Sequence, residues 1–76
     1  MAGLIKNKRY VFTPTVEAEG QNRTDGHVSG LLFREGTFLY YDKEFCVFMG
    51  YPTTRPNVLF MFYIKEKDCK CKCKDT

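Results

Sequence analysis

The last residues of the chain carry its most distinctive side-chain chemistry. Cys69, Cys71 and Cys73 stand on alternate positions, and a lysine follows each of them. In an extended segment this period of two projects the three thiols to one side and the ammonium groups to the other. Thiolates are preferred ligands of zinc and copper(I), so the three cysteines are candidate metal ligands.

The spacing of these cysteines argues against a tetrahedral metal centre. Sulfur atoms at i and i+2 of an extended chain lie too far apart for one ion, and zinc sites usually place two residues between paired cysteines. A fourth ligand would have to be His27 or Cys46, and a thiol in an apolar segment such as that of Cys46 usually fills core space. Interchain disulfides, a redox response and reversible acylation are alternatives. The preferred interpretation is a flexible tail at 69–76 that holds no cofactor, with zinc or copper as the alternative.

The residues that could perform catalysis lack suitable partners in the sequence. His27 is the only histidine, and its spacing from Cys46 and Ser29 matches no signature of nucleophilic catalysis. Asp42 and Glu44 have the character of turn residues rather than of an acid–base pair, and no glycine-rich phosphate loop is present. We therefore expect that the protein is not an enzyme.

A group of aromatic and basic residues is the candidate for recognition of a partner. Its members are Arg34, Phe38, Tyr40, Tyr41, Lys43 and Arg55. Aromatic residues on a sheet with basic neighbours can stack single-stranded bases, and Tyr and Arg equally dominate the hot spots of protein interfaces. Strand alternation offers a third interpretation, in which Phe38 and Tyr40 face the core and only Tyr41 lies outside.

The distribution of charge helps to choose between these partners. The net charge is +3, but residues 1–9 carry +3, residues 10–64 carry −2 and residues 65–76 carry +2. A nucleic-acid-binding domain normally presents a basic face on its folded body. The slightly acidic body therefore favours a protein partner over nucleic acid, with a homo-oligomer as a further alternative.

The elements that must position these residues are expected to be strands. Apolar residues come in short β-branched and aromatic bursts between Gly, Pro, Asn and Asp, without helical periodicity. The expected strands are 9–18, 27–33, 37–41, 45–49 and 58–64. Arg34-Glu35-Gly36 and Asp42-Lys43-Glu44 predict tight turns, whereas Glu19 to Gly26 predicts a long polar loop. Pro14 predicts a bulge or an edge position in the first strand.

The last expected strand is apolar at seven consecutive positions, Val58 to Ile64. Such a strand needs cover on both faces, and no helix is expected to supply it. Closure of the sheet, or burial of one face against a second copy or a partner, would do so; exposure of Met61 and Tyr63 is the alternative. The expected fold is all-β, a small antiparallel sheet of about five strands in a closed or partly open SH3-like or OB-like barrel.

A chain of 76 residues has room for one small domain, which we expect at 1–68. Its N-terminus shows no secretory leader, and the sequence contains no apolar run of membrane-spanning length, so a cytoplasmic location is expected. The expected function is that of a non-catalytic protein-binding module, an accessory subunit or inhibitor of a larger protein, of the kind that viruses direct against their hosts. The alternatives are a barrel that binds single-stranded nucleic acid and a metal- or redox-responsive protein acting through its cysteine tail.

Overall fold

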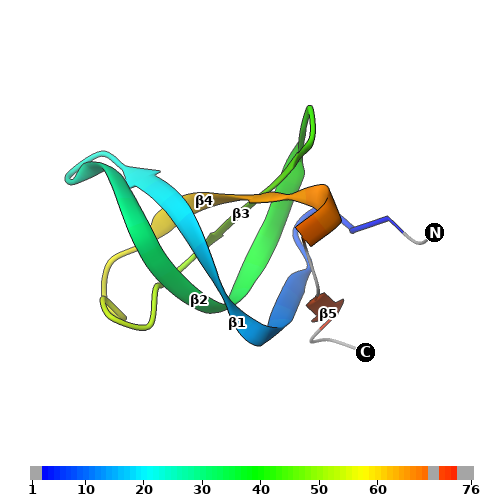
Figure 1. Ribbon diagram of the computed structural model, residues 1–76, viewed down its shortest axis with the longest axis horizontal. Helices are drawn as coiled ribbons and strands as arrows, with labels where there is room; N and C mark the ends of the chain where they lie inside the picture. The colour runs from blue at the N-terminus through cyan, green and yellow to red at the C-terminus, as the bar shows by residue number, and fades with distance from the viewer. Residues whose placement is uncertain (1–2, 69–70, 74–76) are drawn as a thin grey trace.

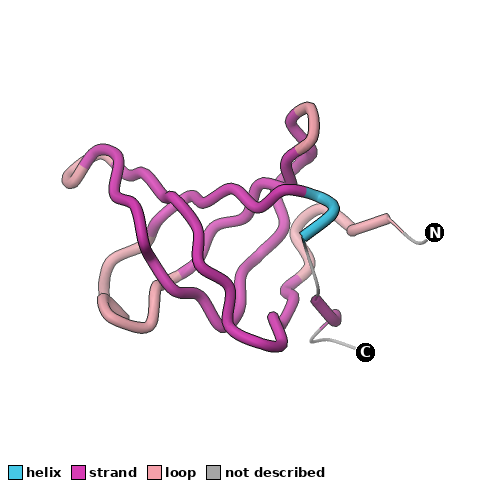
Figure 2. Tube along the Cα trace, viewed as in Figure 1, coloured by secondary structure: helices cyan, strands magenta, loops and turns pink. Residues whose placement is uncertain are grey.

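A computed structural model describes residues 3–68 and 71–73 of the chain. Strands make up most of these residues, and the one helical segment among them is a short 3-10 turn, η1 (Figures 1 and 2). The elements are β1 (Arg9–Asn22), β2 (Gly26–Asp42), β3 (Phe45–Gly50), β4 (Phe60–Lys65), η1 (Glu66–Asp68) and β5 (Cys71–Cys73). All the strand pairings are antiparallel. The predicted all-β class is confirmed.

The sheet closes into a ring because β2 is long enough to pair twice. Residues Gly26 to Thr37 of β2 pair with β1, and its C-terminal part from Thr37 onward pairs with β3. The pairings of β3 with β4 and of β4 with β1 complete the ring, and β5 joins the other edge of β1 (Figure 1). Closure of this kind removes most of the exposed strand edges that an open sheet would present.

Phenylalanine rings fill the interior of the ring. The rings of Phe33 and Phe62 stack with centroids 3.6 Å apart, and Phe48 stacks against Phe62 with a centroid separation of 5.6 Å. Phe12 meets both Phe48 and Phe62 edge-on. Rings in these stacked and edge-to-face arrangements bury large apolar areas, so the aromatic surplus of the sequence is mainly core material.

The tight turn predicted at Arg34-Glu35-Gly36 is wrong, because β2 continues through these residues. Gly36 has another purpose: a Cβ atom built on it would lie 2.7 Å from Cζ of Phe62 and 3.3 Å from Cβ of Phe48. A glycine within a strand often marks such a close approach. Its lack of a side chain lets β2 lie directly against the rings of the core.

The long polar loop predicted at Glu19 to Gly26 is also wrong. Strand β1 extends to Asn22, and a short turn leads into β2 at Gly26, whose φ is +66°. The side-chain Oδ1 of Asn22 accepts a hydrogen bond from the backbone N–H of Asp25 at 2.6 Å, which closes this turn. Asn and Asp commonly stabilise turns through such local bonds.

Other local predictions are confirmed. The register of β1 against β2 shifts between Val11 and Val16, which is the irregularity expected around Pro14. A turn at Lys43, with φ of 58°, connects β2 to β3 as the segment Asp42 to Glu44 predicts.

Strand β4 is covered on one face only. Phe60, Phe62 and Ile64 are buried, whereas Met61 and Tyr63 on the outer face are half-buried. The expectation that both faces are fully covered is therefore wrong. Ring closure buries one side of the apolar run and leaves the other partly accessible.

The C-terminal segment differs from the flexible tail that the sequence predicts. Cys71 to Cys73 form β5, in which Cys73 lies opposite Tyr10 and Cys71 opposite Phe12. Cys69 lies outside the described residues. Strand β5 adds a short backbone ladder to the edge of β1, so the tail contributes to the sheet.

A chain ending after Asp68 is therefore expected to be less stable than the full chain. Loss of the three-residue β5 pairing removes backbone hydrogen bonds, each of which contributes about 0.5–1.5 kcal/mol. Urea unfolding followed by circular dichroism measures the difference, and a chain ending after Cys73 is the matched control that retains β5. Equal midpoints for all three chains would contradict a structural role for β5. Repeating the melts with a chelator separates this effect from that of a structural metal, whose removal would destabilise the full chain.

Candidate functional site

Two of the aromatic residues predicted to bind a partner support the fold. Phe38 is 2% exposed and belongs to the core. Tyr41 packs edge-on against Phe38, with ring centroids 4.8 Å apart, and its hydroxyl accepts a hydrogen bond from the backbone N–H of Leu4 at 2.7 Å. Tyr41 thus holds the N-terminal segment against β2, and Phe38 is not accessible to a partner.

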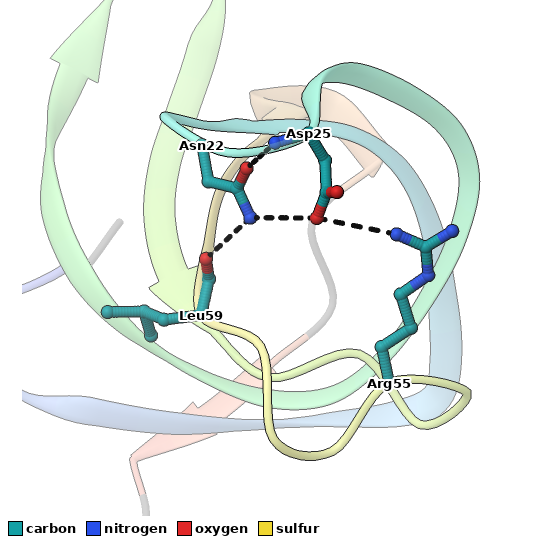
Figure 3. A network of polar contacts seen from close by, with 4 residues as sticks. All are labelled: Asn22, Asp25, Arg55 and Leu59. Atoms are coloured by element: carbon teal, nitrogen blue, oxygen red, sulfur yellow. Dashed lines mark hydrogen bonds and ion pairs between the residues drawn. The ribbon is translucent and has the colours of Figure 1, made fainter.

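The three basic residues of the predicted set do not gather around these aromatics. Nη1 of Arg55 lies 3.5 Å from Oδ2 of Asp25, which ties the loop between β3 and β4 to the β1–β2 turn (Figure 3). Lys43 is exposed in the β2–β3 turn, at the opposite end of β3 from that loop (Figure 1). Arg34 is exposed on β2. Of the six predicted residues, Tyr40 alone contributes to the surface described next.

The register across three strands forms that surface. Tyr40 of β2, Val47 of β3 and Tyr63 of β4 lie opposite one another, so their side chains share one side of the sheet. An irregularity between Phe38 and Tyr40 turns Tyr40 outward, so the interpretation that places it in the core is wrong. The apolar neighbours two residues away on β3 and β4 complete this surface, which comprises Tyr40, Phe45, Val47, Met49, Met61 and Tyr63 and which we call the tyrosine face. Lys65, opposite Phe45 on the same side of the sheet, borders it at the end of β4.

The tyrosine face has a buried floor and an accessible rim. Val47 is 0% exposed although it lies outside the cluster that fills the ring, because the flanking side chains cover it. The ring of Phe45 meets that of Tyr63 edge-on, at a centroid distance of 6.5 Å. Tyr40 is 46% exposed, and Met49 is also exposed. The sheet thus presents ordered apolar side chains to the outside.

Polar groups near Tyr63 give this face an acidic border. The side-chain Nε2 of Gln21 donates a hydrogen bond of 3.0 Å to the Tyr63 hydroxyl. Burial raises the pKa of Tyr63 above its usual 10.0, the nearby Tyr40 and the carboxylates of Asp42 and Glu19 raise it further, and the bond from Gln21 opposes these effects. Tyr63 is neutral at physiological pH, and the charges acting on it are negative.

The raised pKa of Tyr63 predicts how stability depends on alkaline pH. Because the folded-state pKa lies above the unfolded value, the neutral phenol stabilises the fold fully below pH 10, and this contribution is lost as pH rises through the folded pKa. Titration of tyrosinate absorbance at 295 nm should show a transition above pH 10 that disappears in Tyr63→Phe. The variant should also lose less stability than the wild type between neutral pH and pH 11. Identical titrations of the two proteins would contradict the burial of this phenol.

An apolar hollow adjoins the tyrosine face at Met49. Its volume is about 400 Å³, and Tyr51 and Leu59, both exposed, contribute to its lining. Arg9 and Glu35, whose Nη2 and Oε2 atoms lie 3.2 Å apart, line it as well. The hollow provides room for an apolar side chain beside a paired charge.

The loop that carries Leu59 is fixed by the hairpin opposite. Asn22 donates a hydrogen bond from Nδ2 to the carbonyl oxygen of Leu59 at 3.2 Å, and Asp25 pairs with Arg55 (Figure 3). The backbone N–H of Thr53 donates to the carbonyl oxygen of Leu32 at 2.8 Å. These contacts hold the apolar hollow in shape without a partner.

A second hollow, of about 360 Å³, lies on the other side of Tyr63, between β1 and β4. Strands β1 and β4 pair over only three residues each, Glu19 to Gln21 with Tyr63 to Met61, and the hollow occupies the space beyond. The residues that line it are Val16, Glu17, Ala18, Glu19, Phe45, Tyr63, Ile64, Lys65 and Asp68. We call it the β1–β4 gap.

The residues considered for metal binding are not brought together where they are described. His27 is exposed, with its Nδ1 atom 3.2 Å from Oε2 of Glu19, and Cys46 is buried in the core. Among the side chains that the structure describes, no three His, Cys, Asp or Glu residues are grouped to hold an ion. Metal binding by Cys69, Cys71 and Cys73 remains a prediction, because their side chains are not among those described.

Comparison with known proteins adds no identity: no family model, curated protein or solved structure matches the chain. Within the described ranges, 3–68 and 71–73, no helix has the length and apolar character needed to cross a membrane. Function must therefore be inferred from the site itself.

Proposed function

We propose that this protein is a non-catalytic module that binds another protein through the tyrosine face. The observation that carries this proposal is the outward apolar row Tyr40, Val47 and Tyr63 across three paired strands. Tyrosine and methionine are enriched in protein interfaces, and tyrosine adds a polar hydroxyl to a large apolar ring. A rigid sheet also limits the entropy that is lost when a partner binds.

The charges around the face favour protein over nucleic acid as the partner. Glu19 and Asp42 act on Tyr63, and Lys65 lies opposite Phe45, whereas a nucleic-acid site needs several basic groups that contact phosphates. Of the basic residues predicted to serve, Arg55 is paired with Asp25, and Lys43 lies in the β2–β3 turn beside Asp42. A cytoplasmic accessory subunit or inhibitor of a larger protein is the role that we attach to this module.

Capture of the partner by matched variants tests the proposal. The double variant Tyr40→Ser/Met49→Ser removes two exposed anchors from the face, and Ile5→Ser, at a residue 58% exposed outside the face, is the control. Truncation of a hot-spot residue costs about 2 kcal/mol or more, which is roughly 30-fold in affinity. Wild type and Ile5→Ser should capture the same protein from nuclease-treated host extract, and the double variant should lose it with its circular dichroism spectrum unchanged. Equal capture by all three proteins would contradict the proposal. Capture that occurs in untreated extract but is lost after nuclease treatment would contradict it as well.

A further inference from the structure

The β1–β4 gap combines three features that bear on which side chain a partner could insert. It is continuous with the tyrosine face, because Tyr63 and Phe45 belong to both. It has an apolar side formed by Val16, Ala18 and Ile64, which come from strands that separate there. Its volume of about 360 Å³ falls within the range of about 300–1,000 Å³ that is usual for ligand sites.

The charges that line the gap are mostly negative. Glu17, Glu19 and Asp68 are among the residues that line it, and Lys65 is the one basic residue that does so in the described part of the chain. His27 contacts Glu19 from β2, and both side chains remain largely exposed, so the carboxylate still faces solvent. An anionic group would be repelled here, and a cationic group would be attracted.

The aromatic pair adds a second reason for a cation. Phe45 and Tyr63 are held edge-to-face, and the Tyr63 hydroxyl is fixed by Gln21. An ammonium or guanidinium group gains from contact with the face of an aromatic ring, and its alkyl stem can pack on apolar walls. The gap therefore offers both carboxylates and rings to a long basic side chain.

We propose that the protein bound on the tyrosine face inserts a lysine or arginine side chain into the β1–β4 gap, between the Glu17 and Glu19 carboxylates and the Phe45–Tyr63 ring pair. This inference rests on the proposed function, since the face must hold the partner whose side chain reaches the gap. It adds a chemical class to that function: the partner presents an exposed basic residue beside an apolar surface. Charge complementarity of this kind steers association and selects partners.

The test uses blocked peptides and the full-length, ¹⁵N-labelled chain. The probes are acetyl-Thr-Lys-Thr-Lys-Thr-amide, its arginine counterpart, and a neutral counterpart with norleucine in place of lysine. Both basic peptides should shift the backbone amides of residues 17–19 and 63–65 saturably at millimolar concentration, and the norleucine peptide should not. The double variant Glu17→Gln/Glu19→Gln should weaken binding at least about 10-fold. Glu44→Gln, which removes a carboxylate that does not line the gap, should bind like the wild type.

Several outcomes would overturn the inference. Saturable binding of the norleucine peptide, no shift with either basic peptide, or equal affinity for the double variant would each do so. Concentration-dependent shifts of the same amides without peptide would assign the gap to a second copy of the chain, and shifts with an oligothymidine would assign it to nucleic acid. If neither basic peptide binds but the variant Tyr40→Ser/Met49→Ser still fails to capture the partner protein, only the inserted basic side chain is refuted, and the proposed function is not. If the basic peptides bind but that variant still captures the partner protein, the proposed function is refuted instead.

Discussion

Phe62→Ala is expected to leave the protein only marginally stable at room temperature. Phe62 is 0% exposed and its ring stacks on those of Phe33 and Phe48, so the truncation leaves a cavity in the middle of the ring of strands. Loss of a buried phenylalanine costs about 3–5 kcal/mol, and a domain of this size has little more than about 5 kcal/mol to lose. Urea unfolding followed by circular dichroism measures the free energy of unfolding.

Two controls separate cavity formation from a general effect of losing an aromatic residue. Phe62→Leu retains most of the volume and should cost much less than the alanine variant. Tyr51→Ala removes an exposed ring and should leave the free energy of unfolding within about 0.5 kcal/mol of the wild type. A stable, cooperatively folded Phe62→Ala would show that this ring is not central to the core.

Gly36→Ala is expected to destabilise the fold by overpacking the core against Phe62. The added Cβ would lie 2.7 Å from Cζ of the buried Phe62 ring, and strand β2 is paired with β1 at this point, so neither can move cheaply. Overpacking of this kind costs about 1–3 kcal/mol. The midpoint of urea unfolding measures the loss.

Gly3→Ala is the matched control for this substitution. The nearest atom to its added Cβ would be the Tyr41 hydroxyl oxygen at 3.5 Å, an ordinary contact, so stability should not change. Combining Gly36→Ala with Phe62→Leu should cost less than the sum of the two single changes, because the smaller side chain makes room for the methyl group. Strict additivity, or a neutral Gly36→Ala, would contradict the close approach of β2 to Phe62.

The sequence identifies strands well and turns unevenly. Asp42 to Glu44 predicts its turn correctly, because a short polar segment between two apolar bursts has few other solutions. The same logic fails at Gly36, since a glycine needed for a turn and a glycine needed for close packing look alike without knowledge of the tertiary fold. Prediction from the sequence also fails at Cys71 to Cys73, because the pairing of this segment with β1 depends on where the closed ring of strands places the edge of β1.

The candidate site is visible in the sequence only in part. The seven-residue apolar run indicates that one face of the strand needs a further cover, and that face carries Met61 and Tyr63. Whether Tyr40 belongs to the tyrosine face depends on the irregularity after Phe38, which the regular alternation of side chains along a strand cannot reveal. The neighbourhood of Glu17 and Tyr63 likewise depends on how β1 and β4 separate, which is a property of the closed ring.

Site-specific photocrosslinking tests whether the tyrosine face is the surface on which a partner protein binds. p-Benzoylphenylalanine is introduced in place of Tyr40 in one full-length protein and in place of Ile5 in another, both exposed positions. After irradiation in nuclease-treated cell extract, we expect one crosslinked protein with the probe at position 40 and no crosslink to that protein at position 5. No crosslinked protein with the probe at position 40, or the same crosslinked protein with the probe at either position, would show that partners do not bind through this face.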